Sequence, residues 1–460
     1  MREPGAVLLV SCYELGQQPL ALAWPAAFLA RAGFAPATLD VAVEPFDPER
    51  ARRARVALVS TPMHTALRLA VGVAQRIRTL NPGCHVAFFG HYAILNRDWL
   101  LSGPADSVLG GESEDALVTL VSALEAGDDD TVKAIGREGR PRIERLAFPV
   151  PRRSGLPPLD RYARLAHRGG LSPVAAVEAS RGCRHRCRHC PIPPVYGGRF
   201  FVVPREVVLA DVRQAVDGGA AHLTFGDPDF LNGPRHALEV ARAVHREFPA
   251  LTFHFTAKVE HLLRQRRYLA ELVDLGALFA VTAVESLSDT VLQHLDKGHT
   301  QADVLVVTRL ARQAGLALRP TFIPFTPWTA MADLGALLDF VEDEGLVDHV
   351  DPVQYSLRLL VPPGSLLLDT PALQPHLRGL DAGGFHVRWD HPDPRVDALH
   401  ERVAAAVAEA AETGEDPAVT FDRVRGLLAQ GGLLEARAPV ALRLRPDRAR
   451  PPRLTEPWFC

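Results

Sequence analysis

Three cysteines stand close together near the middle of the chain, Cys183, Cys187 and Cys190, with the spacing C-x3-C-x2-C. They follow an apolar, β-branched run over residues 173–177, so one short loop at the end of a strand has to hold three thiols. Iron–sulfur cubanes normally take four thiolates. Three thiolates from a single loop leave one iron open to a ligand other than protein. The spacing therefore predicts a [4Fe–4S] cluster with an open iron.

A zinc site built from cysteine and histidine is the alternative, because His185 and His189 lie in the same loop. Zinc sites usually pair a C-x2-C with a second C-x2-C or H-x3-H segment at a distance, and the sequence contains no such partner. The loop also carries four arginines, Arg181, Arg184, Arg186 and Arg188. Their charge is expected to lower the thiol pKa values and to favour an anionic cluster. The residues favour iron–sulfur over zinc.

The loop resembles the signature of the radical S-adenosylmethionine (SAM) enzymes, with one departure. The residue before the third cysteine is usually aromatic in that family and is His189 here. In the family, the amino and carboxylate groups of SAM chelate the open iron, and one electron cleaves SAM to methionine and a 5′-deoxyadenosyl radical. The resemblance implies a [4Fe–4S] cluster on the three cysteines, SAM as cofactor, and a reducing partner such as flavodoxin or ferredoxin.

The composition is that of an ordinary globular protein, with 47% hydrophobic and 23% charged residues. A length of 460 residues is enough for two or three domains. A net charge of −3 argues against a general nucleic-acid surface. The sequence has no apolar run of about 18 residues, and its N-terminus leads into a strand pattern without a cleavable signal. The six cysteines do not form a disulfide framework. We expect a cytoplasmic protein that acts on a small molecule, without nucleic-acid or membrane partners.

Residues 1–125 alternate apolar runs with helical patterns, which predicts a Rossmann-like, doubly wound parallel sheet with helices on both faces. The expected strands begin near Val7, Ala37, Val56, His85 and Ser107, and the expected helices cover 20–32, 65–80 and 113–125. Polar segments follow three strands, at Ser60, at Gly90-His91 and at Gly110-Gly111-Glu112. A sheet of this kind binds ligands at that edge.

This region resembles the cobalamin-binding-like domain that precedes many radical SAM domains, above all in the run 105–114. The Asp-x-His-x-x-Gly motif that coordinates cobalt in other cobalamin proteins is absent, as it often is in radical SAM relatives. The resemblance implies cobalamin as a further cofactor. The alternative, a degenerate Rossmann domain that shapes the cavity or holds a partner, stays open.

A Pro-rich connector is expected over 126–172, followed by a second series of strands and helices over 173–375. Its strands are expected near Val174, His222, Thr252, Phe279, Leu318 and Pro352. Six parallel strands with intervening helices form a partial (β/α)6 barrel, whose sites collect at the carboxyl ends of the strands. The cysteine loop follows the first of them. Residues 376–460 are expected to form a small helical extension with a Pro- and Arg-rich tail.

Two further strand ends match positions at which the resembled family holds SAM. Gly226, Asp227 and Pro228 occupy the last three positions of a Gly-Gly-Glu-Pro-like turn, with Asp in place of Glu, and imply a contact to the amino group of SAM. Glu285 and Ser286 end the fourth barrel strand. The resemblance implies that they bind the ribose hydroxyls.

The printed chain stops at Cys460, after a segment rich in proline and arginine. A terminal cysteine on a flexible arm can reach an active site and bind iron, a thiophilic atom or a substrate radical, so Cys460 is a candidate catalytic residue; a frayed end is the alternative. The region 177–200 also resembles a narrower radical SAM group whose members end in Cys-Cys-Ala-Glu-Pro or Cys-selenocysteine-Ala-Glu-Pro. One hypothesis is that a selenocysteine codon was read as a stop and that the protein continues.

These features together predict a radical SAM enzyme that cleaves SAM reductively and starts radical chemistry on a small molecule. Methyl transfer or a rearrangement is favoured if cobalamin binds, whereas hydrogen abstraction or transfer of a SAM fragment is open if it does not. A non-catalytic iron–sulfur or zinc protein that senses or binds is the alternative. A sensor has no need of a SAM seat around Gly226 and Glu285.

Overall fold

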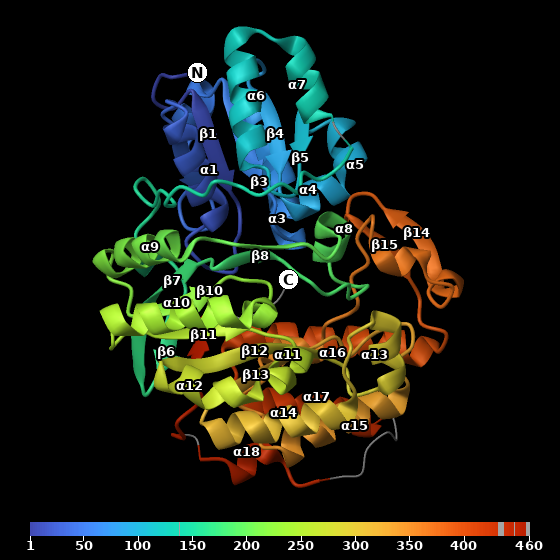
Figure 1. Ribbon diagram of the computed structural model, residues 1–460. Coiled ribbons are helices and arrows are strands. Elements are labelled where there is room, and N and C mark those ends of the chain that lie inside the picture. Colours follow the sequence, from blue (N-terminus) through green and yellow to red (C-terminus); the bar gives the residue numbers. More distant parts are fainter. Residues whose placement is uncertain (138, 431–436, 446, 457–460) are drawn as a thin grey trace.

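The computed structural model describes residues 1–137, 139–430, 437–445 and 447–456. Two α/β units lie one above the other in Figure 1, an N-terminal unit in blue and cyan and a larger unit in green to red. Among the described residues, no helix is both long enough and apolar enough to cross a membrane.

A five-stranded parallel sheet forms the N-terminal unit, with the strand order β2-β1-β3-β4-β5. The strands are β1 (Val7–Ser11), β2 (Ala37–Asp40), β3 (Val56–Ser60), β4 (His85–Phe89) and β5 (Ser107–Leu109). The helices are α1 (Leu20–Arg31), α2 (Pro48–Arg53), α3 (His64–Leu80), α4 (His91–Leu95), α5 (Arg97–Leu101), α6 (Glu114–Ala126) and α7 (Asp129–Gly136). Alternate residues of a strand face opposite sides: Leu8 and Val10 pack with α3, whereas Val7 and Leu9 pack with α1 and α6. The central strands β1, β3 and β4 are mostly apolar because helices cover both faces of the sheet.

A seven-stranded, curled sheet forms the second unit, with the order β13-β12-β11-β10-β7-β6-β16. The strands are β6 (Arg164–His167), β7 (Gly170–Val177), β10 (His222–Phe225), β11 (Thr252–Thr256), β12 (Ala277–Glu285), β13 (Ala317–Phe322) and β16 (Arg453–Leu454). From β7 to β13 the strands are parallel, whereas β6 and β16 extend the sheet by antiparallel pairing. With the Rossmann-like sheet and this half-barrel, the predicted fold class is confirmed.

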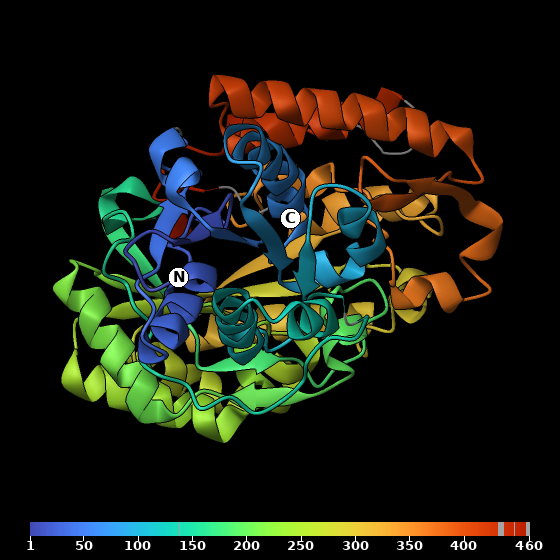
Figure 2. The same cartoon turned by 90° about the horizontal axis from the view of Figure 1, so that it is seen from above.

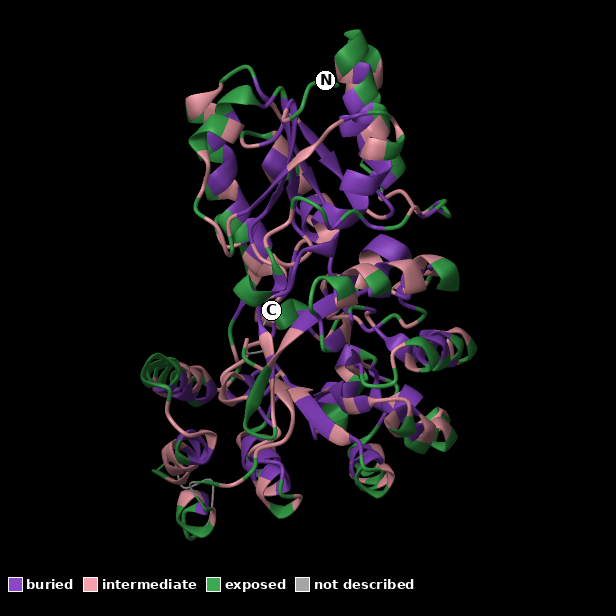
Figure 3. Ribbon diagram, turned by 90° about the vertical axis from the view of Figure 1, so that its left-hand side faces the viewer, coloured by how far each residue is buried: buried purple, intermediate pink, exposed green. Residues whose placement is uncertain are grey.

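Helices cover the outer side of the half-barrel, and Figure 3 shows buried strands inside and exposed helix faces outside. They are α9 (Arg205–Asp217), α10 (Pro234–Glu247), α11 (Val259–Arg264), α12 (Leu269–Asp274), α13 (Asp289–Leu295), α14 (Gln301–Ala314) and α15 (Met331–Asp343). A short helix, α8 (Ile192–Tyr196), follows the cysteine loop, which lies between the small paired strands β8 (Ser180–Gly182) and β9 (Phe200–Val202).

The prediction of a sixth barrel strand near Pro352 is wrong. Residues Pro352–Tyr355 form a 3-10 turn, and among the described residues a single parallel bridge, between Phe325 and Arg358, continues the sheet beyond β13. Proline has no N–H to donate to a strand ladder. The edge of β13 is satisfied instead by a side chain, since Oε1 of Gln354 accepts a hydrogen bond from the Phe322 N–H at 2.9 Å.

The C-terminal region contains three strands that the sequence did not indicate. A hairpin of β14 (Leu377–Asp381) and β15 (His386–Trp389) precedes the helices α16 (Pro394–Thr413), α17 (Pro417–Gln430) and α18 (Val440–Arg443). Figure 2 shows α16 and α17 side by side along one flank. The tail then pairs with the barrel, because β16 lies against β6 with Leu454 opposite Leu165. It runs in the direction of β7, towards the end of the barrel that carries the cysteine loop.

Candidate active site

The three-cysteine loop begins directly after β8, beyond the carboxyl end of β7. Cys183 and Cys187 are buried, Cys190 is partly exposed, and all three thiols are free. The Cys190 N–H donates to the Cys187 carbonyl at 3.2 Å, which closes the turn between them. Gly182 introduces the loop at φ +72°, where a Cβ would meet the Arg199 carbonyl at 2.5 Å. Only glycine fits this entry to the loop.

Polar side chains from neighbouring strand ends hold the loop. Oδ1 of Asn232 accepts the Arg184 N–H at 3.2 Å and lies 3.8 Å from the sulfur of Cys183. The Nε2 atoms of His185 and His261 are 2.9 Å apart, and Nδ1 of His261 is 2.8 Å from Asp229. Both ring nitrogens of His185 thus face groups outside the loop, since its Nδ1 lies 3.4 Å from Glu260. The cysteines remain as a sulfur donor set, which suits iron–sulfur better than a Cys/His zinc site.

Burial, and not the charge of the loop arginines, governs the pKa values of Cys183 and Cys190, contrary to the expectation from the sequence. Burial raises the pKa of Cys190 to about 12, and burial also raises that of Cys183. Arg184 lies over the Phe200 ring and Arg188 donates to the His294 carbonyl. These arginine side chains, although they are next to the cysteines in sequence, contact groups other than the thiols. Binding of a metal cluster would therefore have to drive the deprotonation of these thiols.

Lys297 is the cation that lies beside the cysteines. It is buried, its Nζ is 3.1 Å from Oε1 of Glu285, and its charge opposes the burial effect on the Cys190 pKa. Burial disfavours the charge of Lys297, and Glu285 and Cys187 raise its pKa. An ammonium is thus held in place next to the expected anionic cluster.

Gly226 and Asp227 follow β10, next to the strand that leads into the cysteine loop. The Gly226 N–H donates to the Val177 carbonyl at 2.8 Å. The Asp227 carboxylate is buried and accepts the Ala179 N–H at 2.9 Å and the Ser180 hydroxyl. Burial raises its pKa to about 7, against these hydrogen bonds. Asp227 therefore fastens the Gly226 turn to β8.

Glu285 and Ser286 lie at the carboxyl end of β12, on the side of the loop that carries His189. Oε1 of Glu285 accepts from Lys297 and is 3.2 Å from Nε2 of His189. Burial opposes its ionisation, but Lys297 and His189 hold the pKa of Glu285 at about 2. Ser286 Oγ accepts the Ser288 N–H at 3.0 Å. The described part of the chain offers no hydrogen-bond partner for Oε2 of Glu285.

A cavity of about 260 Å³ lies between the two units. The N-terminal unit contributes the segments that follow β1, β3, β4 and β5, among them Gln17, Ser60, His91 and Glu114. The barrel contributes Glu178, Arg181, Gly182 and Gly226. The ligand edge of the Rossmann-like sheet therefore faces the start of the cysteine loop and the Gly226 turn across one shared space.

Arg181 ties the two units together at this cavity. Its Nη1 is 2.6 Å from Glu114 and 3.2 Å from Glu112, and its Nε is 3.1 Å from Glu178. Burial disfavours the guanidinium charge, but the three carboxylates raise its pKa above the usual range. Trp24 Nε1 also donates to Glu178 at 2.7 Å across the same boundary.

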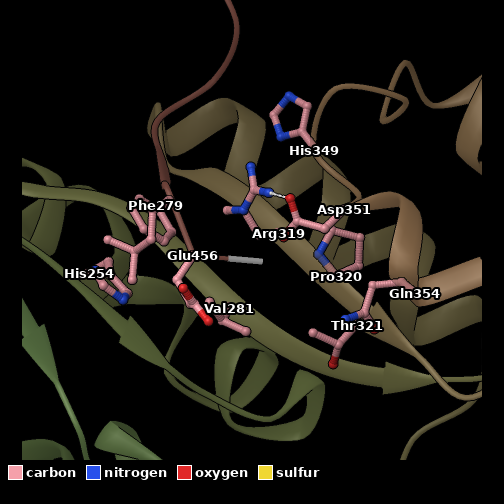
Figure 4. Close-up of a pocket in the computed structure, with 11 residues that line it drawn as sticks. His254, Phe279, Val281, Arg319, Pro320, Thr321, His349, Asp351, Gln354 and Glu456 are labelled. Carbon is pink, nitrogen blue, oxygen red and sulfur yellow. Dashed lines mark hydrogen bonds and ion pairs between the residues drawn. The ribbon is translucent and has the colours of Figure 1, made fainter. Parts of the chain in front are cut away.

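The inner side of the half-barrel holds a second, much smaller cavity of about 20 Å³, which fits about one water molecule. Figure 4 shows His254, Arg319, Asp351 and Glu456 around it. Arg319 Nη2 is 2.6 Å from Asp351, so this arginine forms an ion pair beside the cavity. A substrate has no room here, whereas the interdomain cavity borders the start of the cysteine loop and is the candidate chamber.

Cys460 lies outside the described residues. The sequence had pointed to the cysteines, Gly226, Asp227, Glu285 and Ser286, and these lie around the cysteine loop at the carboxyl ends of the barrel strands. The sequence had not indicated the roles of Asn232 and Lys297. It had also not indicated the ion pairs of Arg181 with Glu112, Glu114 and Glu178. The signal available for them was the polar segment after each strand, of which Gly110-Gly111-Glu112 is one.

Two curated relatives match the chain over part of their length. Hopanoid C-3 methylase of Methylococcus capsulatus is 26% identical over 267 residues, which is 56% of this chain and 50% of that protein. An uncharacterized methyltransferase of Pyrococcus horikoshii is 21% identical over 312 residues, which is 65% of each chain. This chain thus spans between half and two thirds of these relatives.

Solved structures of similar fold cover more of the chain. The radical SAM methyltransferase TsrM of Kitasatospora setae superposes with a TM-score of 0.69 at 17% identity, over 93% of this chain and 95% of that chain. The cobalamin-dependent SAM radical enzyme OxsB superposes with a TM-score of 0.67 at 15% identity, over 86% and 65%. Residues 177–341, from the end of β7 into α15, match the radical SAM superfamily. This part of the chain, with the three-cysteine loop at the rim of its half-barrel, is a radical SAM domain.

Proposed function

We propose that this chain is a radical SAM enzyme that cleaves one SAM reductively to methionine and a 5′-deoxyadenosyl radical. The methyl group of a second SAM, which leaves as S-adenosylhomocysteine, passes to a small molecule held between the two units, with electrons from the reductant. One observation carries the proposal: Gly182 and Gly226, beside the cysteine loop, line the same cavity as Gly90 and Gly111 at the ligand edge of the Rossmann-like sheet. The names of the methylase and methyltransferase relatives support methyl transfer as the reaction.

The described residues around the cysteine loop fit a bound cluster. A bound [4Fe–4S] cluster supplies the electron for SAM cleavage at an iron that the protein leaves open. Cys183, Cys187 and Cys190 would hold the cluster, and Asn232 would keep their loop in place through the Arg184 N–H. Lys297, 3.1 Å from Glu285, would balance part of the negative charge of the cluster.

The strand ends beside the loop would hold SAM. Each carboxylate oxygen has two acceptor positions, so Asp227 can accept from an ammonium group while it keeps Ala179 and Ser180. Gly226 lines the cavity and lets a ligand approach the backbone. Oε2 of Glu285 and the hydroxyl of Ser286 would accept from the ribose hydroxyls. These roles follow the resemblance of the two turns to those of the family.

The contacts across the domain boundary would keep water from the reacting centre. Arg181, Glu112 and Tyr196 are joined by hydrogen bonds and ion pairs, with the Tyr196 hydroxyl donating to Glu112 at 2.6 Å. Trp24 adds a further contact across this boundary, because its Nε1 donates a hydrogen bond to Glu178. A radical formed in the cavity would meet few solvent molecules, which limits side reactions.

Cobalamin is a candidate ligand of the N-terminal unit, because cobalamin is bound in solved structures of the TsrM and OxsB fold. The cavity of about 260 Å³ lies below the range of roughly 300–1,000 Å³ for sites of drug-sized ligands, and a corrinoid is larger than those. We therefore assign no step to it, and its addition forms one arm of the test below.

The proposal also covers the reductant, the compartment and the kind of substrate. A radical SAM domain needs a reductant, and we propose a flavodoxin or ferredoxin in the cytoplasm. The free state of the five described cysteines is consistent with a reducing compartment. A small-molecule substrate, rather than a nucleic acid, suits the size of the cavity, although methylthiotransferases of tRNA and of ribosomal protein uS12 are among the relatives.

We extend the proposal to Cys460 as a thiol that takes part in the reaction after SAM cleavage. The described tail ends at Glu456, which packs against Gly16 in the segment after β1, and Gln17 of that segment lines the cavity. Four residues span at most about 14 Å. A Cys460→Ser variant should keep SAM cleavage and lose product, whereas unchanged product formation would remove Cys460 from the reaction.

The first experiment is anaerobic reconstitution with iron and sulfide, followed by reduction in the presence of SAM carrying a [13C]methyl group. We expect 5′-deoxyadenosine from the wild type and none from Cys187→Ala. Hydroxocobalamin in a parallel arm decides whether the N-terminal unit uses a corrinoid, and the fate of the 13C label separates methyl transfer from transfer of another SAM fragment. An intact cluster without SAM cleavage, under conditions in which a known radical SAM enzyme turns over, would favour a sensor.

A further inference from the structure

The interdomain cavity carries an excess of carboxylates. Glu14, Glu114 and Glu178 line it, against Arg181 as the single guanidinium among the lining residues. His91 also lines it, but burial lowers the pKa of this imidazole to about 4 and leaves it neutral. Like charges gathered in a buried space are costly unless cations meet them. The cavity therefore favours a positively charged occupant.

Arg181 does not satisfy all of these carboxylates. Its Nη1 contacts Oε1 of Glu114, and its Nε contacts Oε2 of Glu178. Glu14 instead caps the start of α1, where its oxygens accept the N–H groups of Leu20 and Ala21 at 3.0 and 3.2 Å. Burial, and next the Glu178 charge, raise the pKa of Glu14 to about 8. Glu14 therefore holds a proton at neutral pH and adds a polar group, but no negative charge, to the cavity wall.

Three buried polar groups of the cavity wall lack partners among the described residues. They are Oε2 of Glu114, both amide atoms of Gln17 and the hydroxyl of Thr224. Glu114 and Gln17 are each only 5% exposed. Nearly all buried polar atoms in proteins are hydrogen-bonded, and an unpaired one costs stability. Their common position on the wall indicates a polar ligand, and Oε2 of Glu114 and the amide oxygen of Gln17 are the acceptors that it can donate to.

We propose that the substrate of this chain carries a cationic nitrogen group, an ammonium or amidinium, which donates to Oε2 of Glu114 and to the amide oxygen of Gln17. The remainder of the substrate would lie against Trp24, which lines the same cavity. Because it names the substrate class for the interdomain chamber, this inference rests on the proposed function. The guanidinium of Arg181 is enclosed by three carboxylates, so an anionic substrate finds no free cation among the lining residues.

The test compares a cation with a neutral molecule of the same shape. Equilibrium dialysis of the reconstituted full-length protein against [14C]benzylammonium and against [14C]benzyl alcohol gives the two dissociation constants. We expect the cation to bind at least about tenfold more tightly, as for a hydrogen bond to a charged group. Equal binding of the two probes would overturn the inference.

Variants locate the binding in the cavity. Glu114→Gln keeps the size of the side chain and should weaken benzylammonium by about tenfold, while Gln17→Met should weaken it by severalfold. Glu247→Gln, an exposed residue paired with Arg213 far from the cavity, is the matched control and should bind as the wild type does. An unchanged affinity in both cavity variants would contradict the assignment.

Two further arms separate this inference from the proposed function. The neutral amide groups of a corrinoid also donate hydrogen bonds and would fit the same oxygens of Glu114 and Gln17. Displacement of benzylammonium by hydroxocobalamin would therefore overturn the assignment of this site to the substrate. Simultaneous binding of the two molecules would support the assignment. SAM cleavage to 5′-deoxyadenosine is measured on the same preparation. If SAM is cleaved but the cation is not preferred, the proposed function stands and the cationic substrate class is contradicted. If the cation is preferred but SAM is not cleaved, the substrate class stands and the proposed function is contradicted.

Discussion

The Tyr13 hydroxyl donates a hydrogen bond of 2.8 Å to Oε1 of Glu456, so the two units of the chain are joined by residues 443 positions apart. Glu456 follows β16, and its side chain also packs on Gly16. The tail thus supports the segment after β1 that places Glu14 and Gln17 on the cavity wall. A segment that composition marks as a disordered end is part of the barrel sheet.

Removal of this hydrogen bond should loosen the tail. We expect Tyr13→Phe to weaken tail docking by about 1 kcal/mol and to speed tryptic cleavage after Arg453 by severalfold, as followed by mass spectrometry. Phe201 is a partly exposed aromatic outside the tail contact, and Phe201→Leu serves as the control. A cleavage rate in Tyr13→Phe equal to that of the wild type would mean that strand pairing alone holds the tail.

Cluster assembly should depend on the loop cysteines only. Cys187→Ala should lose most of the iron and sulfide bound after reconstitution, because two thiolates cannot hold a cubane in this loop. Cys84→Ala removes a buried thiol of the N-terminal core and should retain full iron content. Iron and sulfide assays on both variants decide the matter, and equal iron in the two would contradict the assignment.

The Lys297 ammonium should tune the reduction potential of the cluster. Without this buried cation the added electron is less favoured, so Lys297→Met should shift the potential to more negative values, by about 59 mV for each tenfold change in the equilibrium. An EPR-monitored redox titration measures the shift. Lys258→Met, which removes a lysine paired with Glu260, should shift it less; a larger shift there would place the important cation elsewhere.

Gly182 should resist substitution. Gly182→Ala places a side chain at φ +72° and against the Arg199 carbonyl, which should cost about 1–3 kcal/mol of unfolding free energy and reduce cluster retention. Gly72 in α3 has open space at the Cβ position, and Gly72→Ala should stabilise the protein by roughly 0.5–1 kcal/mol. Urea denaturation of both variants compares the two effects. Equal stability of the two would show that the entry to the loop tolerates a side chain.

The pH dependence of stability should report on Glu14. Its pKa is raised from 4.5 to about 8 in the fold, so between these values the folded chain holds a proton that the unfolded chain has released. The stability from this group is complete below pH 4.5 and is lost as the pH rises towards 8, with a slope of up to about 1.4 kcal/mol per pH unit.

Glu14→Gln removes this proton, so its stability relative to the wild type should improve as the pH rises. Denaturation curves at about pH 5.5 and about pH 7.5 measure the change. Glu3→Gln at an exposed position is the control and should follow the wild type. A difference between Glu14→Gln and the wild type that stays constant with pH would show that Glu14 is ionised throughout.

Local patterns in the sequence carried most of the fold. Continuous apolar runs such as Val56–Ser60 predict buried parallel strands, because both of their faces need to be covered. Where a side chain substituted for backbone pairing, the pattern was misleading: Gln354 meets the edge of β13, and the expected strand at Pro352 is a 3-10 turn. The bounds of the domains and the selenocysteine hypothesis stay predictions.

The sequence by itself placed three thiols within eight residues, so one short loop carries all of them however the chain folds. It also determined the two sheets, through the spacing of apolar residues. Only the tertiary structure decided which charges meet. Arg181 lies in the cysteine loop by sequence, yet its partners Glu112 and Glu114 are 69 and 67 residues away, in the other unit. Ion pairs across a domain boundary depend on how the two sheets stack, and no local pattern specifies that.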